Sequence, residues 1–152
     1  MRVLKSVSLP AIIAILFFLS CKHSDDTTIL SRRNVKLEGS QEVPPKTGTG
    51  TGSIDYDYNK ATRTLSFTVT FSSMSDTVIA AHIHGSAQRG YNASPVQDYT
   101  AAIPKRKEGT YSNSMYVDGV KITEQDLFRG GYYFNIHTKT NPGGEIRAQI
   151  VF

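Results

Sequence analysis

The chain has 152 residues and a formal net charge of +4, which suits one domain of ordinary size and leaves hardly enough length for two. Arg2 and Lys5 lie in an N-terminal segment that differs from the rest, and without them the net charge is about +2. So small a basic excess argues against a nucleic-acid partner. Cys21 is the one cysteine, which excludes an internal disulfide and a cysteine-based zinc site.

Residues 1–20 have the pattern of a secretory signal. A basic start is followed by the apolar run "LPAIIAILFFL", which is too short to span a bilayer as a permanent helix. Ser20 directly before Cys21 resembles the lipobox of bacterial lipoproteins, in which the signal is removed and the cysteine is acylated, typically with palmitate. The resemblance predicts a protein anchored to a lipid membrane through Cys21. An ordinary cleaved signal that leaves a free cysteine is the alternative.

The segment 21–33 is predicted to be a flexible tether, because "KHSDDTTILSRR" is polar and lacks periodicity. Its beginning, "KHSDD", also resembles the surface-export signal of Bacteroidetes-type lipoproteins. A plain solvated linker explains the same residues equally well. We expect a cell-envelope location in the outer membrane, and the export motif, where it acts, would place the domain on the cell surface.

From Asn34 to the C-terminus, apolar and polar residues alternate in short runs that are typical of β-strands. The clearest runs are "TGSIDYDYN", "TLSFTVTF" and the closing residues from Ile146 to Phe152. Turn signals such as "NKATR", "SSMSD" and "TNPGG" separate them. The pattern predicts one all-β domain over residues 34–152, an antiparallel β-sandwich of seven to eight strands.

One segment near the C-terminal third departs from the two-residue period. In "KITEQDLFRGG", Thr123 is followed three residues later by Asp126, which is a weaker relative of the capping box. Gly130 and Gly131 then offer a helix stop. We expect one short helix here.

Two strands carry histidines in an unusual pattern. In "VIAAHIHG", Ile79, Ala81 and Ile83 are predicted to face the core, which puts His82 and His84 together on the opposite face. In "YYFNIHT", Asn135 and His137 likewise alternate with the apolar residues. If the two strands are neighbours, His82, His84 and His137 can converge.

Converging imidazoles suit zinc or copper, because both metals take neutral imidazole nitrogen as a ligand. The alternative is a structural clasp, in which the histidines bond backbone carbonyls or carboxylates such as Glu42 and Glu145 and bind nothing. The sequence leaves both interpretations open.

Four pieces in order give the chain a resemblance to the CHRD domain family, named for a module of chordin. They are "LEGSQEVPP" at 37–45, "AAHIHG" at 80–85, "FNIHT" at 134–138 and "NPGGEIRAQI" at 141–150. The resemblance runs from about residue 35 to the C-terminus. It implies an extracellular β-sandwich module, associated in animals with binding of secreted growth factors. For bacterial members it implies no established enzyme activity.

The resemblance marks a set of positions that we expect to gather on one part of the sandwich as a binding or structural cluster. The expected cluster comprises Glu42, His82, His84, Asn135, His137, Glu145 and Arg147; the family also marks Pro44, Pro45 and Gly144, which lie outside this cluster. The chain departs from the family pattern in the loop "SAQRGYNASPV", which is poorer in glycine, and at Ala148, where glycine is usual. The first departure alters a loop that could shape a binding surface, so the identity of the ligand is left undetermined. The second replaces one small residue with another and should not disturb the fold.

The sequence thus predicts a membrane-anchored, non-catalytic binding or structural module of the envelope, with a protein or glycan partner and no nucleic acid. The alternative is a zinc or copper protein that uses His82, His84 and His137, with weak enzymatic activity.

Overall fold

The alternating segments form strands that pair into one antiparallel sheet. A computed structural model describes residues 28–152. The strands are β1 (Ile29–Glu38), β2 (Thr51–Asn59), β3 (Thr64–Ser72), β4 (Val78–Gly85), β5 (Pro95–Asp98), β6 (Gly109–Tyr116), β7 (Tyr132–Thr138) and β8 (Ile146–Ile150). A 3-10 turn, Gly39–Gln41, follows β1, and the helix α1, Glu124–Phe128, precedes β7. The predicted signal segment, the predicted lipidation site Cys21 and the predicted tether up to residue 27 lie outside the described residues.

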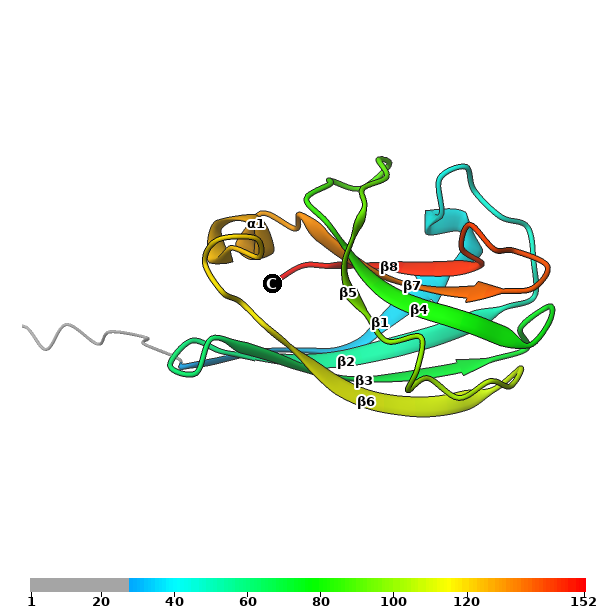
Figure 1. The fold of residues 1–152 in the computed structure, drawn as a ribbon, viewed down its shortest axis with the longest axis horizontal. Coiled ribbons are helices and arrows are strands. Elements are labelled where there is room, and N and C mark those ends of the chain that lie inside the picture. Colours follow the sequence, from blue (N-terminus) through cyan, green and yellow to red (C-terminus); the bar gives the residue numbers. More distant parts are fainter. Residues whose placement is uncertain (1–27) are drawn as a thin grey trace, which may run out of the picture.

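The sheet folds over into two layers. Its strand order is β5-β4-β7-β8-β1-β2-β3-β6, and every pair is antiparallel. One layer holds β5, β4, β7 and β8, and the other holds β1, β2, β3 and β6 (Figure 1). The single pair Glu38↔Arg147 joins β8 to β1, so the layers meet along a narrow seam. The predicted antiparallel β-sandwich with one short helix is confirmed, and its eight strands curl almost into a barrel.

The first strand begins earlier than the sequence predicted. Residues 29–33, assigned to the tether, belong to β1, and Ile29 to Arg32 pair with β2 from Ile29↔Asn59 onward, so that part of the tether prediction is wrong. The register shifts between Arg32 and Val35, where Asn34 has a φ of 54°. The residues before this bulge are exposed apart from the partly buried Leu30, so they lack the apolar face by which a strand is recognised in a sequence.

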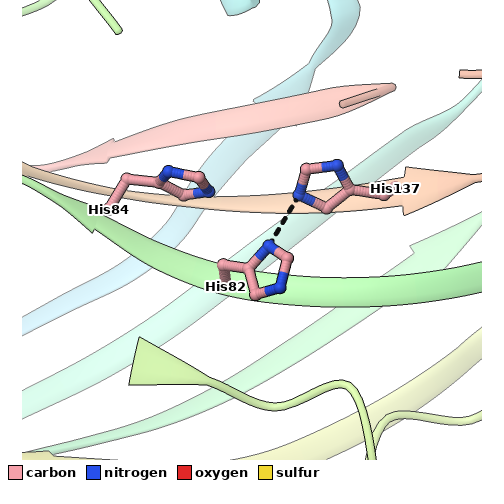
Figure 2. A group of neighbouring side chains, drawn as sticks. All are labelled: His82, His84 and His137. Atoms are coloured by element: carbon pink, nitrogen blue, oxygen red, sulfur yellow. Dashed lines mark hydrogen bonds between the residues drawn. The ribbon is translucent and has the colours of Figure 1, made fainter. Parts of the chain in front are cut away.

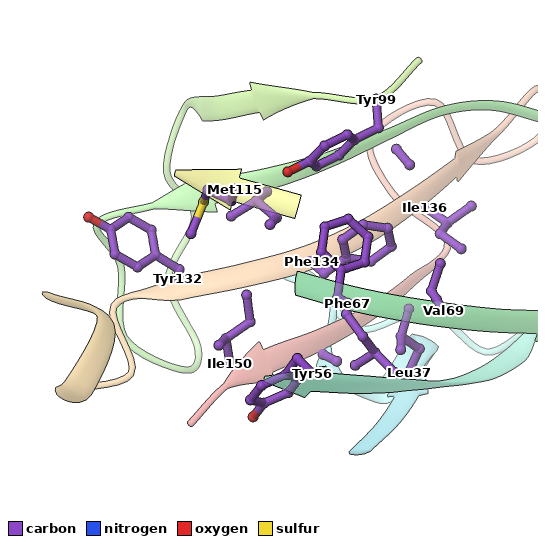
Figure 3. Close-up of a cluster of buried hydrophobic side chains, with 14 of the residues drawn as sticks. Leu37, Tyr56, Phe67, Val69, Tyr99, Met115, Tyr132, Phe134, Ile136 and Ile150 are labelled. Atoms are coloured by element: carbon purple, nitrogen blue, oxygen red, sulfur yellow. The ribbon is translucent and has the colours of Figure 1, made fainter. Parts of the chain in front are cut away.

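The core fills the space between the two layers with side chains from nearly every strand (Figure 3). Five of the large apolar side chains in this core are 0% exposed: Leu37, Val69, Phe134, Ile136 and Ile150. One predicted core residue is misplaced. The pairing of β4 with β7 shifts between Val78 and Ala80, so Val78 enters the core and Ile79 is only partly buried.

The short helix forms where the sequence predicted it. The Thr123 hydroxyl accepts a hydrogen bond from the Asp126 N–H at 3.1 Å and caps the first turn. Gly130, at a φ of +70°, ends the helix. Leu127 is fully buried, and Phe128 packs edge-on against Tyr58, with ring centroids 5.7 Å apart.

Within residues 28–152 there is no helix with the length and hydrophobicity that a membrane crossing requires.

A tyrosine in β2 holds the C-terminal end of the chain to the core. Tyr56 is 1% exposed, and its hydroxyl donates to the Val151 carbonyl at 2.6 Å and accepts from the Val151 N–H at 2.9 Å. Tyr56→Phe removes both hydrogen bonds and should lower the free energy of unfolding by about 1–2 kcal/mol. Urea denaturation measures this loss. Tyr116→Phe, at a side chain that is 56% exposed, is the matched control and should change little. Equal stability of the two variants would contradict the role given to Tyr56.

Candidate functional site

The residues that alternate with the core on β4, β7 and β8 form a second, polar layer on the outer face of these strands. One row across the strands pairs His84 with Tyr133 and Tyr133 with Gln149. The next row runs across five strands. It consists of Asp98, His82, Asn135, Arg147 and Glu38. His137 lies opposite Ala80 in the row after that.

Loops cover the middle of this outer face, so most of its polar side chains on β7 and β8, together with His84, are buried, whereas His82 is partly buried and Asp98 and Glu38 at the edges are exposed. The loop of residues 86–94 and the segment after β1 rise above β4, β7 and β8 (Figure 1). Gln149 donates to the Ala87 carbonyl at 2.9 Å, and Asn92 ties the two loops together by donating to the Val43 carbonyl at 2.9 Å. This cover on one face and the core on the other together bury all seven residues of β7. Water is displaced from this layer, and its polar groups must find partners within the protein.

The three predicted histidines converge beneath this cover (Figure 2). One nitrogen can be chosen from each ring so that all three atoms lie within 4.8 Å of one another. His82 Nδ1 is 2.9 Å from His137 Nε2. His84 and His137 are 8% and 6% exposed. The sequence made this convergence conditional on the two histidine-bearing strands being neighbours, and β4 and β7 do pair directly.

Two of the rings are held in one tautomer by backbone carbonyls. His84 Nδ1 lies 2.8 Å from the Ala93 carbonyl oxygen, and His137 Nδ1 lies 2.9 Å from that of Pro142. A carbonyl oxygen only accepts, so both Nδ1 atoms carry the proton and donate. In the neutral rings both Nε2 atoms are therefore left with a lone pair. His84 Nε2 is buried without a hydrogen-bond partner.

The third ring presents its other nitrogen to the centre. His82 Nδ1 faces His137 Nε2, whereas His82 Nε2 lies 3.5 Å from Asp98 Oδ1 and 3.4 Å from Thr100 Oγ1. With its proton on Nε2, beside the Asp98 carboxylate, His82 offers the Nδ1 lone pair to the centre. With the proton on Nδ1, it donates to His137 instead. Both forms are neutral imidazole, so the choice between them does not change the charge of the site.

Burial keeps these imidazoles uncharged at neutral pH. It lowers the pKa of His137 to about 4, although the bond to Pro142 acts in the opposite direction. Burial also lowers the pKa of His84 and that of His82, where the Asp98 charge opposes the shift. Neutral imidazole is the form that ligates metal ions, so no proton has to be displaced near pH 7.

Arg147 is buried beside the histidines, and its positive charge adds to the effect of burial in lowering the pKa of His84. It is 1% exposed, and its guanidinium carbon lies 3.3 Å from the ring centroid of Tyr133. The same tyrosine ring stacks on His84, with centroids 4.7 Å apart and planes 4° from parallel. Arg147 donates to the Tyr91 carbonyl at 3.0 Å and to Gln149 Oε1 at 3.2 Å. These contacts turn the cation toward the 86–94 loop.

Glu145 belongs to a separate hydrogen-bonded clasp. Its carboxylate accepts from the Ser75 N–H at 2.7 Å and the Ser75 hydroxyl at 2.6 Å, and from the Thr138 hydroxyl and, at 3.3 Å, Asn141 Nδ2. Burial acts to raise the pKa of Glu145, but these hydrogen bonds outweigh it and hold the pKa below its ordinary value. The clasp ties the end of β7 to the segment before β4.

Glu42 contrasts with Glu145, because it is buried with few donors. It is 4% exposed, and its Oε1 has no hydrogen-bond partner. Burial raises the pKa of Glu42 to about 7, against the opposing effects of the Arg147 charge and the Asn135 side chain. Glu42 thus lies next to Arg147 and Asn135, as the expected cluster required.

The structure divides the predicted cluster in two and corrects the hydrogen-bond partners of its histidines. His82, His84, Asn135 and His137 meet, with Glu42 and Arg147 at their edge, whereas Glu145 serves the clasp. The expected carboxylate partners of the rings, Glu42 and Glu145, give way to Ala93, Pro142 and Asp98. Sequence reasoning missed Tyr133 and Asp98. Tyr133 shares the alternation of Asn135 and His137, which could have revealed it, but nothing in the sequence marks Asp98.

Comparison with known proteins gives one match. The family model of the CHRD domain matches residues 33–150, which include every member of the predicted cluster. No curated protein and no solved structure matches the chain. The resemblance drawn from the four sequence pieces is thereby confirmed.

The clasp generates a pH-dependent prediction. Glu145→Gln removes the charge that four donors bond, and should lower the free energy of unfolding by about 1–3 kcal/mol at pH 7. Because the folded-state pKa lies below the ordinary 4.5, the contribution is present above that value and is lost as the pH falls through the folded pKa. Urea denaturation at pH 7 and below pH 4 measures both. The exposed Glu108→Gln is the control. A difference from wild type that persists unchanged in acid would contradict the assignment.

Proposed function

This chain belongs to the CHRD domain family, and on that premise we propose that it is a lipid-anchored, non-catalytic module of the cell envelope that holds a zinc or copper ion through His82, His84 and His137. The family supplies the expectation of an extracellular binding or structural module. The convergence of three imidazoles supplies the expectation of a metal.

The observation that carries the proposal is the lone pair of His84 Nε2, which is buried without a partner while the opposite nitrogen donates to the Ala93 carbonyl. An unpaired buried acceptor costs about 1–3 kcal/mol. His137 repeats the arrangement, with Nδ1 donating to Pro142 and Nε2 turned inward. A bound cation would satisfy both lone pairs at once, whereas a purely structural clasp would leave the His84 acceptor unpaired.

The surroundings of the rings are those that metal-binding histidines usually have. Such histidines donate their second ring N–H to a carbonyl or a carboxylate, which fixes the tautomer and the ring orientation. Ala93 and Pro142 supply carbonyls, and Asp98 supplies a carboxylate 3.5 Å from His82 Nε2. Neutral imidazoles suit zinc and copper among the common metals.

The location rests on the N-terminal sequence and on the family. The basic start, the short apolar run and Ser20-Cys21 support export and lipidation at Cys21. Six residues, 22–27, then separate the acylated cysteine from the described domain, which begins at Thr28. At about 3.3 Å per extended residue they reach roughly 20 Å. The domain would therefore stay close to the membrane surface.

Metal binding is tested on the mature chain purified without an affinity tag. We expect one zinc or copper ion per chain by elemental analysis, and a higher melting temperature when the metal is added. At a free metal concentration a hundred times the Kd, the stabilisation should be about 2.7 kcal/mol. His82→Ala, His84→Ala and His137→Ala should each abolish most of the binding. His23→Ala, at the remaining histidine and outside the described domain, is the matched control and should bind normally.

Two results would count against the metal. One is a wild-type melting temperature that neither chelator nor added zinc or copper changes. The other is a His23→Ala variant that loses as much binding as the three site variants, because binding would then not depend on the site. Loss of stability in the site variants with no metal bound would favour the clasp for the histidines.

Anchoring is tested by Cys21→Ser. The variant lacks the lipid acceptor, so we expect uncleaved precursor or protein released from the membrane fraction, as shown by gel mobility and detergent phase partition. Ser24→Ala, a similarly small change in the tether, should partition like the wild type. A Cys21→Ser protein that fractionates and migrates as the wild type does would show that the anchor lies elsewhere.

A further inference from the structure

A fourth polar atom points to the centre of the three histidines. Asn135 lies on β7 opposite His82, and it is 2% exposed. Its Oδ1 is 3.0 Å from His137 Nε2. His137 donates from Nδ1 to Pro142, so its Nε2 carries a lone pair, and an amide oxygen also only accepts. Two buried acceptors thus face each other at hydrogen-bond distance, an arrangement that is unfavourable unless a positive charge lies near both.

The Glu42 carboxyl, on the side of Asn135 that faces away from the imidazoles, explains how the Asn135 amide is oriented. Gly144 lies there, with a φ of +123°, and a Cβ at this position would be 2.5 Å from Glu42 Oε1 and 2.9 Å from Asn135 Nδ2. The amide nitrogen and the Glu42 carboxyl therefore adjoin the same point. The ionised carboxylate of Glu42 only accepts and an NH₂ group donates, so Glu42 in its charged form turns Nδ2 toward itself and Oδ1 toward the imidazoles. A flipped amide would set its oxygen against the carboxylate.

The distances fit one coordination shell. A tetrahedral site with bonds of 2.0–2.1 Å places neighbouring ligand atoms about 3.3 Å apart. His82 Nδ1 and His137 Nε2 are 2.9 Å apart, and His137 Nε2 and Asn135 Oδ1 are 3.0 Å apart. For these two pairs, shifts of a few tenths of an ångström would reach that spacing. The ligand nitrogens of the three rings lie within 4.8 Å of one another, so binding would also draw the rings together around the ion. An oxygen that only bonded a metal-bound water would lie farther from the ligand nitrogens.

We propose that Asn135 Oδ1 is the fourth ligand of the ion held by His82, His84 and His137, and that Glu42 orients the Asn135 amide for this role. The inference rests on the proposed function. It defines the site as three imidazole nitrogens and one amide oxygen, without sulfur, which favours divalent zinc or copper(II) over copper(I). A site closed by four protein ligands holds its metal as a structural or carried ion, which agrees with a non-catalytic module.

The test uses Co²⁺ as a spectroscopic substitute for Zn²⁺ and measures the Zn²⁺ Kd by competition, both on the mature, untagged chain. Asn135→Leu keeps a similar volume and removes the oxygen. Even the loss of a partner outside the coordination shell weakens metal affinity about 10–100-fold, so removal of a ligand should cost at least tenfold. The visible Co²⁺ spectrum should also change, because water replaces the amide. Asn113→Leu, at an exposed asparagine on β6 in the other layer, is the matched control and should keep both values.

A second substitution keeps the test decisive if Asn135→Leu does not fold. Asn135→Asp retains an oxygen at the same place and makes it a stronger ligand. It should bind Zn²⁺ at least as tightly as the wild type and shift the Co²⁺ spectrum. An unchanged Co²⁺ spectrum in Asn135→Asp, or an unchanged Zn²⁺ Kd in folded Asn135→Leu, would overturn the role of Asn135 and leave the three-histidine site standing. Absence of Zn²⁺, Co²⁺ and Cu²⁺ binding by the wild type would instead refute the proposed function itself.

Discussion

Burial of β7 on both faces is the constraint on which the rest of the structure depends. All seven residues of Tyr132–Thr138 are buried, between β4 on one side and β8 on the other. Phe134 and Ile136 enter the core of the sandwich, which any half-buried strand would achieve. Asn135 and His137 are buried on the other face as well, under loops instead of a second sheet. A strand in this position needs hydrogen-bond partners for every polar side chain it carries.

Backbone atoms of the covering loops meet most of that need. Ala93 in the 86–94 loop bonds His84, and Pro142 in the β7–β8 connection bonds His137. Ala87 and Gly130 accept from Gln149 in the same way, at 2.9 and 2.6 Å. Backbone carbonyls only accept hydrogen bonds, so each polar side chain turns a donor toward the covering loops. Its acceptor lone pair is then left on the opposite side. The accumulation of acceptors at the centre of the histidines therefore follows from how the loops close over the sheet.

Two buried glutamates show how strongly the local supply of donors matters. Glu145 and Glu42 are 1% and 4% exposed, and burial alone would raise the pKa of both. Glu145 accepts from Ser75, Thr138 and Asn141, which lowers its pKa and makes it a charged structural clasp. Glu42 has no partner for Oε1, and its pKa rises to about 7. The two glutamates are similarly exposed, yet their pKa values shift in opposite directions, because Glu145 accepts hydrogen bonds that Glu42 lacks.

The sequence by itself determined the architecture and the central members of the site, its three histidines and Asn135. The two-residue period set the faces of β2, β3, β7 and most of β4, and the Thr123 cap with its glycines located α1, because these signals are local in the chain. The same period placed His82 and His84 on one face of their strand. It failed before the bulge near Asn34, where the strand exposes nearly every side chain, and at the register shift near Ile79, where the alternation is reversed. Only the tertiary structure decided which groups bond the rings, that Glu145 leaves the cluster and that Asn135 turns its oxygen inward. Those contacts join residues that are distant in the chain through loops without a periodic pattern, and their hydrogen-bond directions depend on positions that local sequence does not specify.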